Sequence, residues 1–250
     1  MIKRAYTCIP DTTSASMASM ASRLGAKAAY ALPKAFALDT TQWTVHDQQS
    51  ESSCVGYAAS SAREHYCRTK GKPVELSPLF IYWWARHFEN GTSVDGGSKI
   101  ANAMMSLREI GVCEDKYMPN VPGTNSDVFI APPSVSLVSA KNFIIQSYES
   151  LPDLDSIKLA LTKGDPVVLG IPVYSGLESA KVTRSGVITL PDDKERLLGG
   201  HAIVAVGYDD STELVKFHNS WGAKWGDKGY GYVPYQYLDE NYFNAWVMKI

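Results

Sequence analysis

The hydrophobic pattern of this chain changes once, close to Pro166, and this change limits the folds that the chain can adopt. Before it, apolar residues recur at helical spacing in three segments, at about 53–70, 77–90 and 98–111. After it come short apolar runs typical of strands, at 167–173, 186–190, 201–208, 213–218, 229–233 and 245–250. A helical half followed by a mostly antiparallel β half predicts an α+β fold with two lobes.

Charge and hydropathy exclude several classes of protein. The 250 residues carry a formal net charge of −2 and no basic stretch, so we expect neither nucleic acid nor a membrane as a partner. No apolar run approaches the roughly 18 residues of a membrane span. The charged start at Lys3-Arg4 is not followed by the apolar core of a secretory signal. A cytoplasmic location is therefore favoured, and non-classical export is left open.

The cysteines bear on metal and redox chemistry. There are four of them, Cys8, Cys54, Cys67 and Cys113, and none pairs with another at a metal-ligand spacing, so no metal site is expected. So few cysteines favour a reducing compartment. A single Cys67–Cys113 disulfide is left open.

Cys54 stands in the predicted first turn of the first helix, directly after the polar stretch 47–53. A helix N-terminus stabilises the thiolate, which is the reactive form of cysteine. The polar stretch has no apolar face to bury, and we expect it to line a cleft. A cysteine of this kind is more often a small buried apolar residue, so its interpretation as a nucleophile depends on the rest of the chain.

Near the other end of the chain, the strand pattern predicts that a histidine and an asparagine lie close together. His201 opens an apolar strand, and after a turn at 209–211 a second strand returns and ends at Asn219. Such a hairpin places Asn219 near His201. An amide in that position can hold an imidazole in one orientation, as the third member of a catalytic triad does.

Together these residues resemble the papain family of cysteine peptidases. Gln48 precedes Cys54 by six residues, and 147 residues separate Cys54 from His201, which is similar to that family. The family's Asn-Ser-Trp-Gly…Trp-Gly…Gly-Tyr signature is matched from Asn219 to Tyr230. Weaker matches lie at 76–78, 95–97 and 164–168, and the resemblance covers about 38–250.

The resemblance implies a papain-like two-lobed fold, with a helical lobe at about 39–130 and an antiparallel, β-barrel-like lobe at about 131–250 around an active-site cleft. It implies that Cys54 and His201 form a thiolate–imidazolium pair that attacks a peptide bond through a thioester. Asn219 would orient His201, and Gln48 would complete the oxyanion hole. No cofactor is implied, and we expect a monomer that acts on a peptide or protein substrate. The implied substrate-binding residues are Asp95, Gly96, Gly97, Gly200, Trp221 and Trp225.

The chain also departs from the family pattern. It reads Glu51-Ser52-Ser53-Cys54-Val55 where the family commonly has Cys-Gly-Ser-Cys-Trp, so the usual disulfide beside the active site is absent. Gly200 stands where an acidic residue or asparagine is often found. The same triad would serve an acyltransferase or an isopeptide amidase, because pocket shape decides the substrate. A non-catalytic peptide-binding module is a further alternative.

Residues 1–38 are expected to form an N-terminal extension before a peptidase domain at 39–250. A weakly amphipathic helix is predicted within 14–31, before Pro33. The extension would restrain activity as a pro-segment or cleft-covering arm, or would be an inert surface arm. The stretch 121–136, rich in Pro, Ser, Gly and Asn, predicts a long loop.

Overall fold

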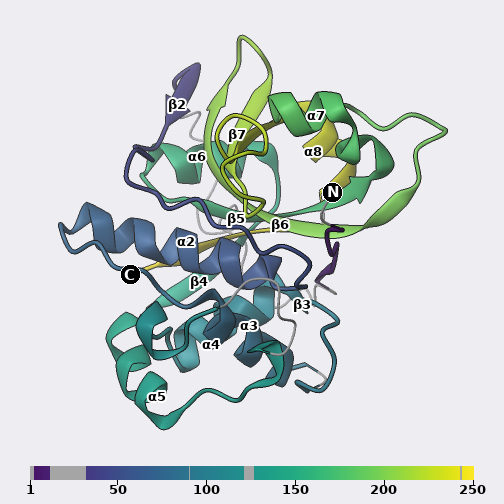
Figure 1. Ribbon diagram of the computed structural model, residues 1–250. Helices are drawn as coiled ribbons and strands as arrows, with labels where there is room; N and C mark the ends of the chain where they lie inside the picture. Colours follow the sequence, from purple (N-terminus) through teal and green to yellow (C-terminus); the bar gives the residue numbers. More distant parts are fainter. Residues whose placement is uncertain (1–2, 12–31, 90, 121–126, 243) are drawn as a thin grey trace.

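A computed structural model describes residues 3–11, 32–89, 91–120, 127–242 and 244–250, and it has a helical half and a sheet half (Figure 1). This arrangement confirms the predicted α+β class. The helical half contains α2 (Cys54–Thr69), α3 (Pro78–His87), α4 (Ile100–Glu109) and α5 (Ser134–Ala140). The first two predicted helices are confirmed to within a few residues.

The sheet half is antiparallel. Its strands follow the order β4–β9–β5–β6–β7–β8, and the short strand β2 pairs with β6. Across the described residues the pairing leaves the sheet open, so the β-barrel-like lobe is not a closed barrel. The strand bounds are β2 (Ala35–Ala37), β4 (Ser147–Leu151), β5 (Val167–Tyr174), β6 (Leu197–Asp209), β7 (Leu214–His218), β8 (Tyr230–Pro234) and β9 (Asn244–Lys249). Three further helices are α6 (Leu154–Thr162), α7 (Ala180–Ser185) and α8 (Tyr235–Asn241).

Helix α2 is the centre of the molecule, and it packs against α3 and α4 as well as β5 and β6. Its sequence is rich in Ala, Ser and Gly, and almost every residue from Cys54 to Cys67 is buried. Gly56 allows the close approach of α3, because a side chain there would collide with the carbonyl oxygen of Pro78. Small residues thus let α2 lie between the sheet and the other helices.

Local capping signals explain where α3 and α6 begin. The Ser77 hydroxyl accepts a hydrogen bond from the Phe80 N–H at 3.1 Å, and Pro78 occupies the first turn. Asp153 and Ser156 form a reciprocal capping box at α6. This box was present in the sequence, but neither α6 nor the preceding strand β4 was predicted.

The third predicted helix begins later than expected. The first residue of the predicted range, Ser98, belongs to the short strand β3 (Ser98–Lys99), and α4 starts at Ile100 after Lys99. Strand β3 pairs in parallel with β1 (Cys8–Ile9) from the N-terminal segment. Residues 98 and 99 thus pair with a segment about 90 residues away in the chain and are not part of the helix.

Two other predictions need correction. The stretch 186–190 is not a strand, because Gly186 is the left-handed C-cap of α7 and Val187 makes only an isolated bridge to Tyr232. The loop expected at 121–136 is interrupted by a 3-10 turn at Asp127–Phe129 and by the start of α5 at Ser134. Residues 121–126, and the helix predicted within 14–31, lie outside the described residues.

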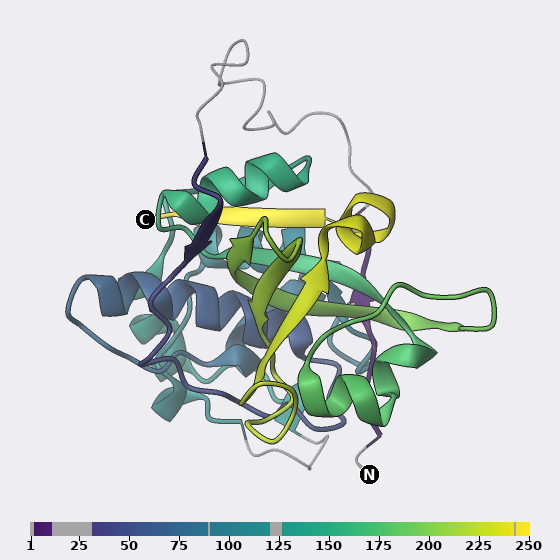
Figure 2. The same cartoon turned by 90° about the horizontal axis from the view of Figure 1, so that it is seen from above.

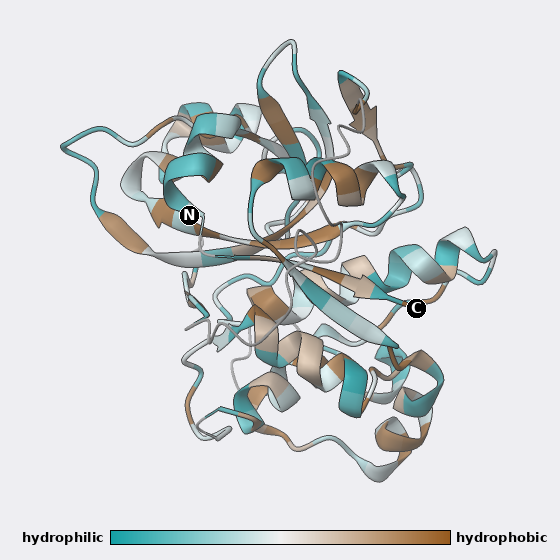
Figure 3. Cartoon of the chain, turned by 180° about the vertical axis from the view of Figure 1, so that it is seen from behind, coloured by the Kyte–Doolittle hydropathy of each residue, from teal (hydrophilic) through white to brown (hydrophobic). Residues whose placement is uncertain are grey.

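Seen from above, the segment that joins α7 to β6 projects from the body (Figure 2). Coloured by hydropathy, the central strands carry long hydrophobic stretches (Figure 3), and β5 is buried along nearly its whole length. Among the described residues, no helix has both the length and the apolar character needed to cross a membrane.

Candidate active site

Cys54 is the first residue of α2, and its side chain is fully buried. The sulfur accepts hydrogen bonds from backbone N–H groups, including those of Val55 on α2, Ala202 on β6 and Thr7 in the N-terminal segment. Burial raises the pKa of the thiol to about 11, although these hydrogen bonds oppose the rise. The helix start therefore presents donors to the sulfur as expected, but the enclosed surroundings favour the neutral thiol.

His201 and Asn219 lie side by side, as the predicted hairpin required. His201 is on β6, Asn219 directly follows β7, and the two strands pair with Val204 opposite His218. The His201 Nε2–H donates to the Asn219 Oδ1 at 2.8 Å. Because Nε2 is hydrogen-bonded to Asn219, Nδ1 is the basic nitrogen of His201. This atom has no hydrogen-bond partner among the described residues.

The His201 imidazole is enclosed on one face by Trp221. The two rings are stacked with centroids 4.5 Å apart, and Trp221 meets Trp225 edge-on at 5.2 Å. Burial lowers the pKa of His201 to about 4, the hydrogen bond to Asn219 opposes this, and the positive charge of Arg4 adds to it. The thiolate–imidazolium pair implied by the resemblance is thus disfavoured in this enclosed arrangement.

Gln48 joins the loop before Cys54 to the loop after β7. Its backbone N–H donates to the Ser220 carbonyl at 2.9 Å, and its side-chain Oε1 accepts from the Ser220 hydroxyl at 2.6 Å. The Gln48 Nε2 donates to the Glu51 carbonyl at 2.7 Å. An amide nitrogen carries two hydrogens, so one donor remains for a ligand.

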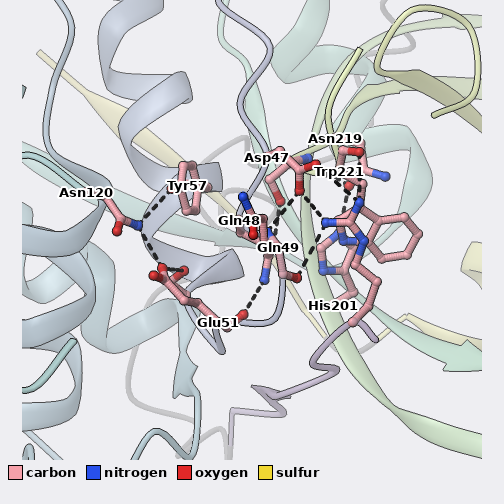
Figure 4. A network of polar contacts seen from close by, with 12 residues as sticks. Asp47, Gln48, Gln49, Glu51, Tyr57, Asn120, His201, Asn219 and Trp221 are labelled. Atoms are coloured by element: carbon pink, nitrogen blue, oxygen red, sulfur yellow. Dashed lines mark hydrogen bonds and ion pairs between the residues drawn. The ribbon is translucent and has the colours of Figure 1, made fainter. Parts of the chain in front are cut away.

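Buried polar contacts hold the rest of this loop (Figure 4). The Glu51 carboxylate accepts from the Ser53 hydroxyl at 3.2 Å and from the Asn120 amide at 2.7 Å, and that amide also donates to the Tyr57 hydroxyl at 2.9 Å. Burial raises the pKa of Glu51, which the two donors oppose. Sequence reasoning missed this cluster, because no local pattern links Asn120 to the loop.

The expected substrate-binding residue Asp95 also supports this loop. Its carboxylate accepts from the Ser52 N–H at 3.2 Å and its carbonyl oxygen from the Ser52 hydroxyl at 2.9 Å. The Tyr82 hydroxyl donates to the same carboxylate and accepts from the Gly97 N–H at 3.1 Å. Through Tyr82, Asp95 therefore connects the loop before Cys54, residues 47–53, to the backbone of Gly97.

The described N-terminal residues 3–11, which we call the N-terminal strap, run along this site and lie beside β3 in Figure 1. The Tyr6 carbonyl accepts from the Gly200 N–H at 3.3 Å. Thr7 forms a parallel bridge with Gly200, and its carbonyl leaves no room for a side chain at Gly97. The expected substrate-binding residues Gly97 and Gly200 are thus both in contact with the strap.

Side chains anchor the beginning of the strap. Arg4 forms an ion pair with Asp47 and donates to the Trp221 carbonyl at 3.0 Å, and the Tyr6 hydroxyl donates to the Glu178 carboxylate at 2.8 Å. No sequence pattern predicts these contacts, because the partners are far apart in the chain. With the strap in place, Cys54 is sealed from solvent.

The chain is similar to a family of known proteins. The family description "papain family cysteine protease" matches residues 32–241 of the chain. The chain belongs to the papain family. This assigns it to the cysteine-type peptidases, which are hydrolases of peptide or protein substrates.

The sequences of individual relatives support the assignment to the papain family. An uncharacterised peptidase C1-like protein of Acanthamoeba polyphaga mimivirus is 30% identical, and the match covers 84% of this chain and 68% of the viral protein. A cathepsin L-like peptidase of Aedes aegypti is 29% identical, and the match covers 74% of this chain and 53% of the peptidase. The chain thus spans about half to two thirds of the length of these relatives.

Solved papain-like structures match the fold. Xylellain, a cysteine protease from Xylella fastidiosa, is 30% identical, with a TM-score of 0.85 and coverage of 99% of this chain and 96% of its own. A digestive procathepsin L 3 of Tenebrio molitor is 18% identical, with a TM-score of 0.69 and coverage of 88% and 70%. At that identity the second match concerns the fold alone.

In this papain-family chain the site is free of disulfides. All four cysteines lie in the described residues, and all are free and buried, including Cys67 and Cys113. Among the described residues there is no group of three or more His, Cys, Asp and Glu side chains that could hold a metal ion.

Proposed function

We propose that this protein hydrolyses peptide bonds with Cys54 as nucleophile, His201 as base and Asn219 as the residue that orients the base. The observation that carries the proposal is the 2.8 Å contact between His201 Nε2 and Asn219 Oδ1 on a hairpin whose Ala202 N–H reaches the Cys54 sulfur. This geometry leaves Nδ1 of His201 to take the thiol proton. We expect the protein to act as a monomer.

The reaction follows from these positions. His201 Nδ1 takes the thiol proton, and the sulfur attacks the peptide carbonyl carbon to form a tetrahedral oxyanion. The second N–H of Gln48 Nε2 and the Cys54 backbone N–H would stabilise that oxyanion. Collapse expels the amine, which takes the proton from His201, and leaves a thioester. Water, deprotonated by His201, then releases the acid and restores the thiol.

We also propose that the N-terminal strap restrains this activity. Thr7 occupies the space beside the Cys54 sulfur, and the strap carbonyls use backbone positions at Gly97 and Gly200 that a substrate would need. The strap also excludes water, which favours the neutral thiol and imidazole over the reactive ion pair. Displacement of the strap would both open the site and permit the ion pair. We retain 1–38 as the extension and 39–250 as the peptidase domain in this proposal.

Hydrolysis of a fluorogenic peptide library under reducing conditions tests both parts. Cys54→Ala should abolish turnover. Arg4→Ala removes the ion pair between Arg4 and Asp47. Because this contact is partly exposed and stabilises the closed strap by about 1 kcal/mol, its loss should raise turnover about fivefold. The matched control is Arg108→Ala, whose side chain is 56% exposed at the end of α4. Turnover that survives Cys54→Ala contradicts the peptidase mechanism, and an unchanged rate in Arg4→Ala contradicts the restraint.

A further inference from the structure

A small cavity lies next to the proposed triad, where α2 packs against β6. It has a volume of about 10 Å³, and its lining includes His46, Ser61 on α2, Val204 on β6, His218 on β7 and Asn219. That volume is close to the least that one water molecule requires. The cavity therefore admits a single water, provided that polar groups are there to bind it.

The Asn219 amide brings an unpaired donor to this cavity. Its Oδ1 accepts the His201 Nε2–H at 2.8 Å and the Ser220 N–H at 2.8 Å. Its Nδ2 carries two hydrogens but has no hydrogen-bond partner among the described residues, although the residue is only 2% exposed. A buried donor without a partner costs free energy, because its bonds to water are lost. The amide is thus satisfied at its oxygen and unsatisfied at its nitrogen.

His218 brings an unpaired acceptor to the same cavity. Its ring donates a hydrogen bond to the Thr44 carbonyl oxygen, and its Nε2 has no partner in the described part of the chain, so the donor to Thr44 is Nδ1. Burial lowers the pKa of His218 to about 4, with further lowering by His46 and Arg68. The ring is therefore neutral at pH 7, and its Nε2 is an acceptor.

Two aromatic rings hold His218 in this position. Its imidazole meets Trp43 edge-on at 5.2 Å and lies against Tyr230 at 5.2 Å, measured between ring centroids. The residue is 4% exposed, so Nε2 cannot turn towards bulk solvent. Its hydrogen-bonding capacity must be satisfied from within the cavity.

We propose that His218 is a positioning residue for catalysis, and that it acts on Asn219 through one water molecule bound in this cavity. This inference rests on the proposed peptidase function. The water donates to His218 Nε2 and accepts from Asn219 Nδ2, so one molecule satisfies both unpaired atoms. Because the water donates to His218, its oxygen is free to accept from the amide nitrogen.

The bound water matters because the two ends of an amide have similar shapes and opposite hydrogen-bonding properties. An inverted Asn219 would set its Nδ2 against the Nε2–H of His201, where two donors meet and no bond forms. The Ser220 N–H opposes this inversion at the oxygen, and the water opposes it at the nitrogen. His218 thereby keeps Asn219 in the orientation that holds the base.

The kinetic test is a double-mutant cycle in the full chain, with hydrolysis of one fluorogenic peptide as the assay. His218→Phe keeps an aromatic ring but removes the acceptor, and kcat should fall about three- to tenfold with little change in KM. In an Asn219→Ala background the same change should have no further effect, because His218 acts only through that amide. His218→Gln, whose side-chain oxygen can replace Nε2, should restore most of kcat. The control is His87→Phe, at an exposed histidine of α3.

Two kinetic results overturn the inference. One is an equal loss of kcat from His218→Phe in the wild-type and Asn219→Ala backgrounds, since a residue that only supports the fold affects both alike. The other is a His218→Gln variant that is as slow as His218→Phe.

A crystal structure of the full chain tests the water without catalysis. Density for one water within hydrogen-bond distance of Asn219 Nδ2 and His218 Nε2 supports the inference, and a cavity without such density overturns it. Absence of Cys54-dependent cleavage for every peptide would contradict the proposed function, while the density still decides whether a water links the two side chains.

Discussion

The two walls of the candidate active site are held by different kinds of contact. One wall, which we call the base wall, carries His201, the proposed base, and Asn219; these residues belong to β6 and to the end of β7, and a backbone ladder sets their relative position. The other wall, which we call the nucleophile wall, is the loop 47–53 before the proposed nucleophile, and it is held mainly by side chains, through Gln48, Glu51 and Asp95. The base wall therefore tolerates little change in register, whereas the nucleophile wall depends on individual polar groups.

Removing the proposed base should have the largest effect. His201→Ala leaves the ladder in place but removes the proton acceptor, and we expect kcat/KM to fall by about 10²–10⁴. Steady-state hydrolysis of the peptide library, together with the rate of alkylation of Cys54 by iodoacetamide, checks this. The exposed Lys141→Ala on the opposite half serves as a control. An alkylation rate equal to that of the wild type would mean that His201 does not activate the thiol.

On the nucleophile wall, Gln48→Ala removes the proposed oxyanion donor and should lower kcat by roughly 10²–10³ with a smaller change in KM. Steady-state kinetics on one fluorogenic peptide measures both constants. The matched control is Gln42→Ala, at an exposed glutamine before the same loop. A rise in KM at unchanged kcat would assign Gln48 to substrate binding alone.

Acid should also lower the stability of the base wall. His218, on β7 next to Asn219, is buried against Trp43 and Tyr230, and burial lowers its pKa to about 4, with further lowering by His46 and Arg68. Because the unfolded chain binds a proton near pH 6.5 and the folded chain does not, the stability that this group provides is present above pH 6.5 and is lost as pH falls towards 4.

At pH 5 the loss from His218 alone should be about 2 kcal/mol. Urea unfolding at pH 7 and pH 5 measures it, and His218→Phe, which keeps an aromatic ring, should reduce the difference between the two pH values. The same difference in His218→Phe as in the wild type would show that other groups cause the acid sensitivity.

The smallest effect is expected from the polar cluster of the nucleophile wall. Asn120→Ala removes a donor from the buried Glu51 carboxylate and should lower the free energy of unfolding by about 1–2 kcal/mol. Urea unfolding at pH 7 gives the value, with the exposed Asn142→Ala as the control. If both variants unfold alike, the Glu51–Asn120 contact does not stabilise the loop.

The difference between the walls also explains what could be predicted. The approach of Asn219 to His201 needed only a hairpin, which short-range strand and turn patterns indicate. The start of α2 at Cys54 followed from a helical pattern after a polar stretch. The role of Asp95 in supporting Ser52, and of Asn120 in supporting Glu51, could not be predicted, since these pairs join segments that no periodicity relates.

The sequence by itself determined the α+β class, the hairpin that joins His201 to Asn219, and the position of Cys54 at a helix start. These features depend on residues that are neighbours in the chain or on one regular element, so local patterns are sufficient. Only the tertiary structure placed the N-terminal strap over the sulfur and enclosed the cavity between Ser61 on α2 and His218 on β7. Those contacts join residues more than 40 positions apart, and their formation depends on how the two halves pack rather than on any local preference.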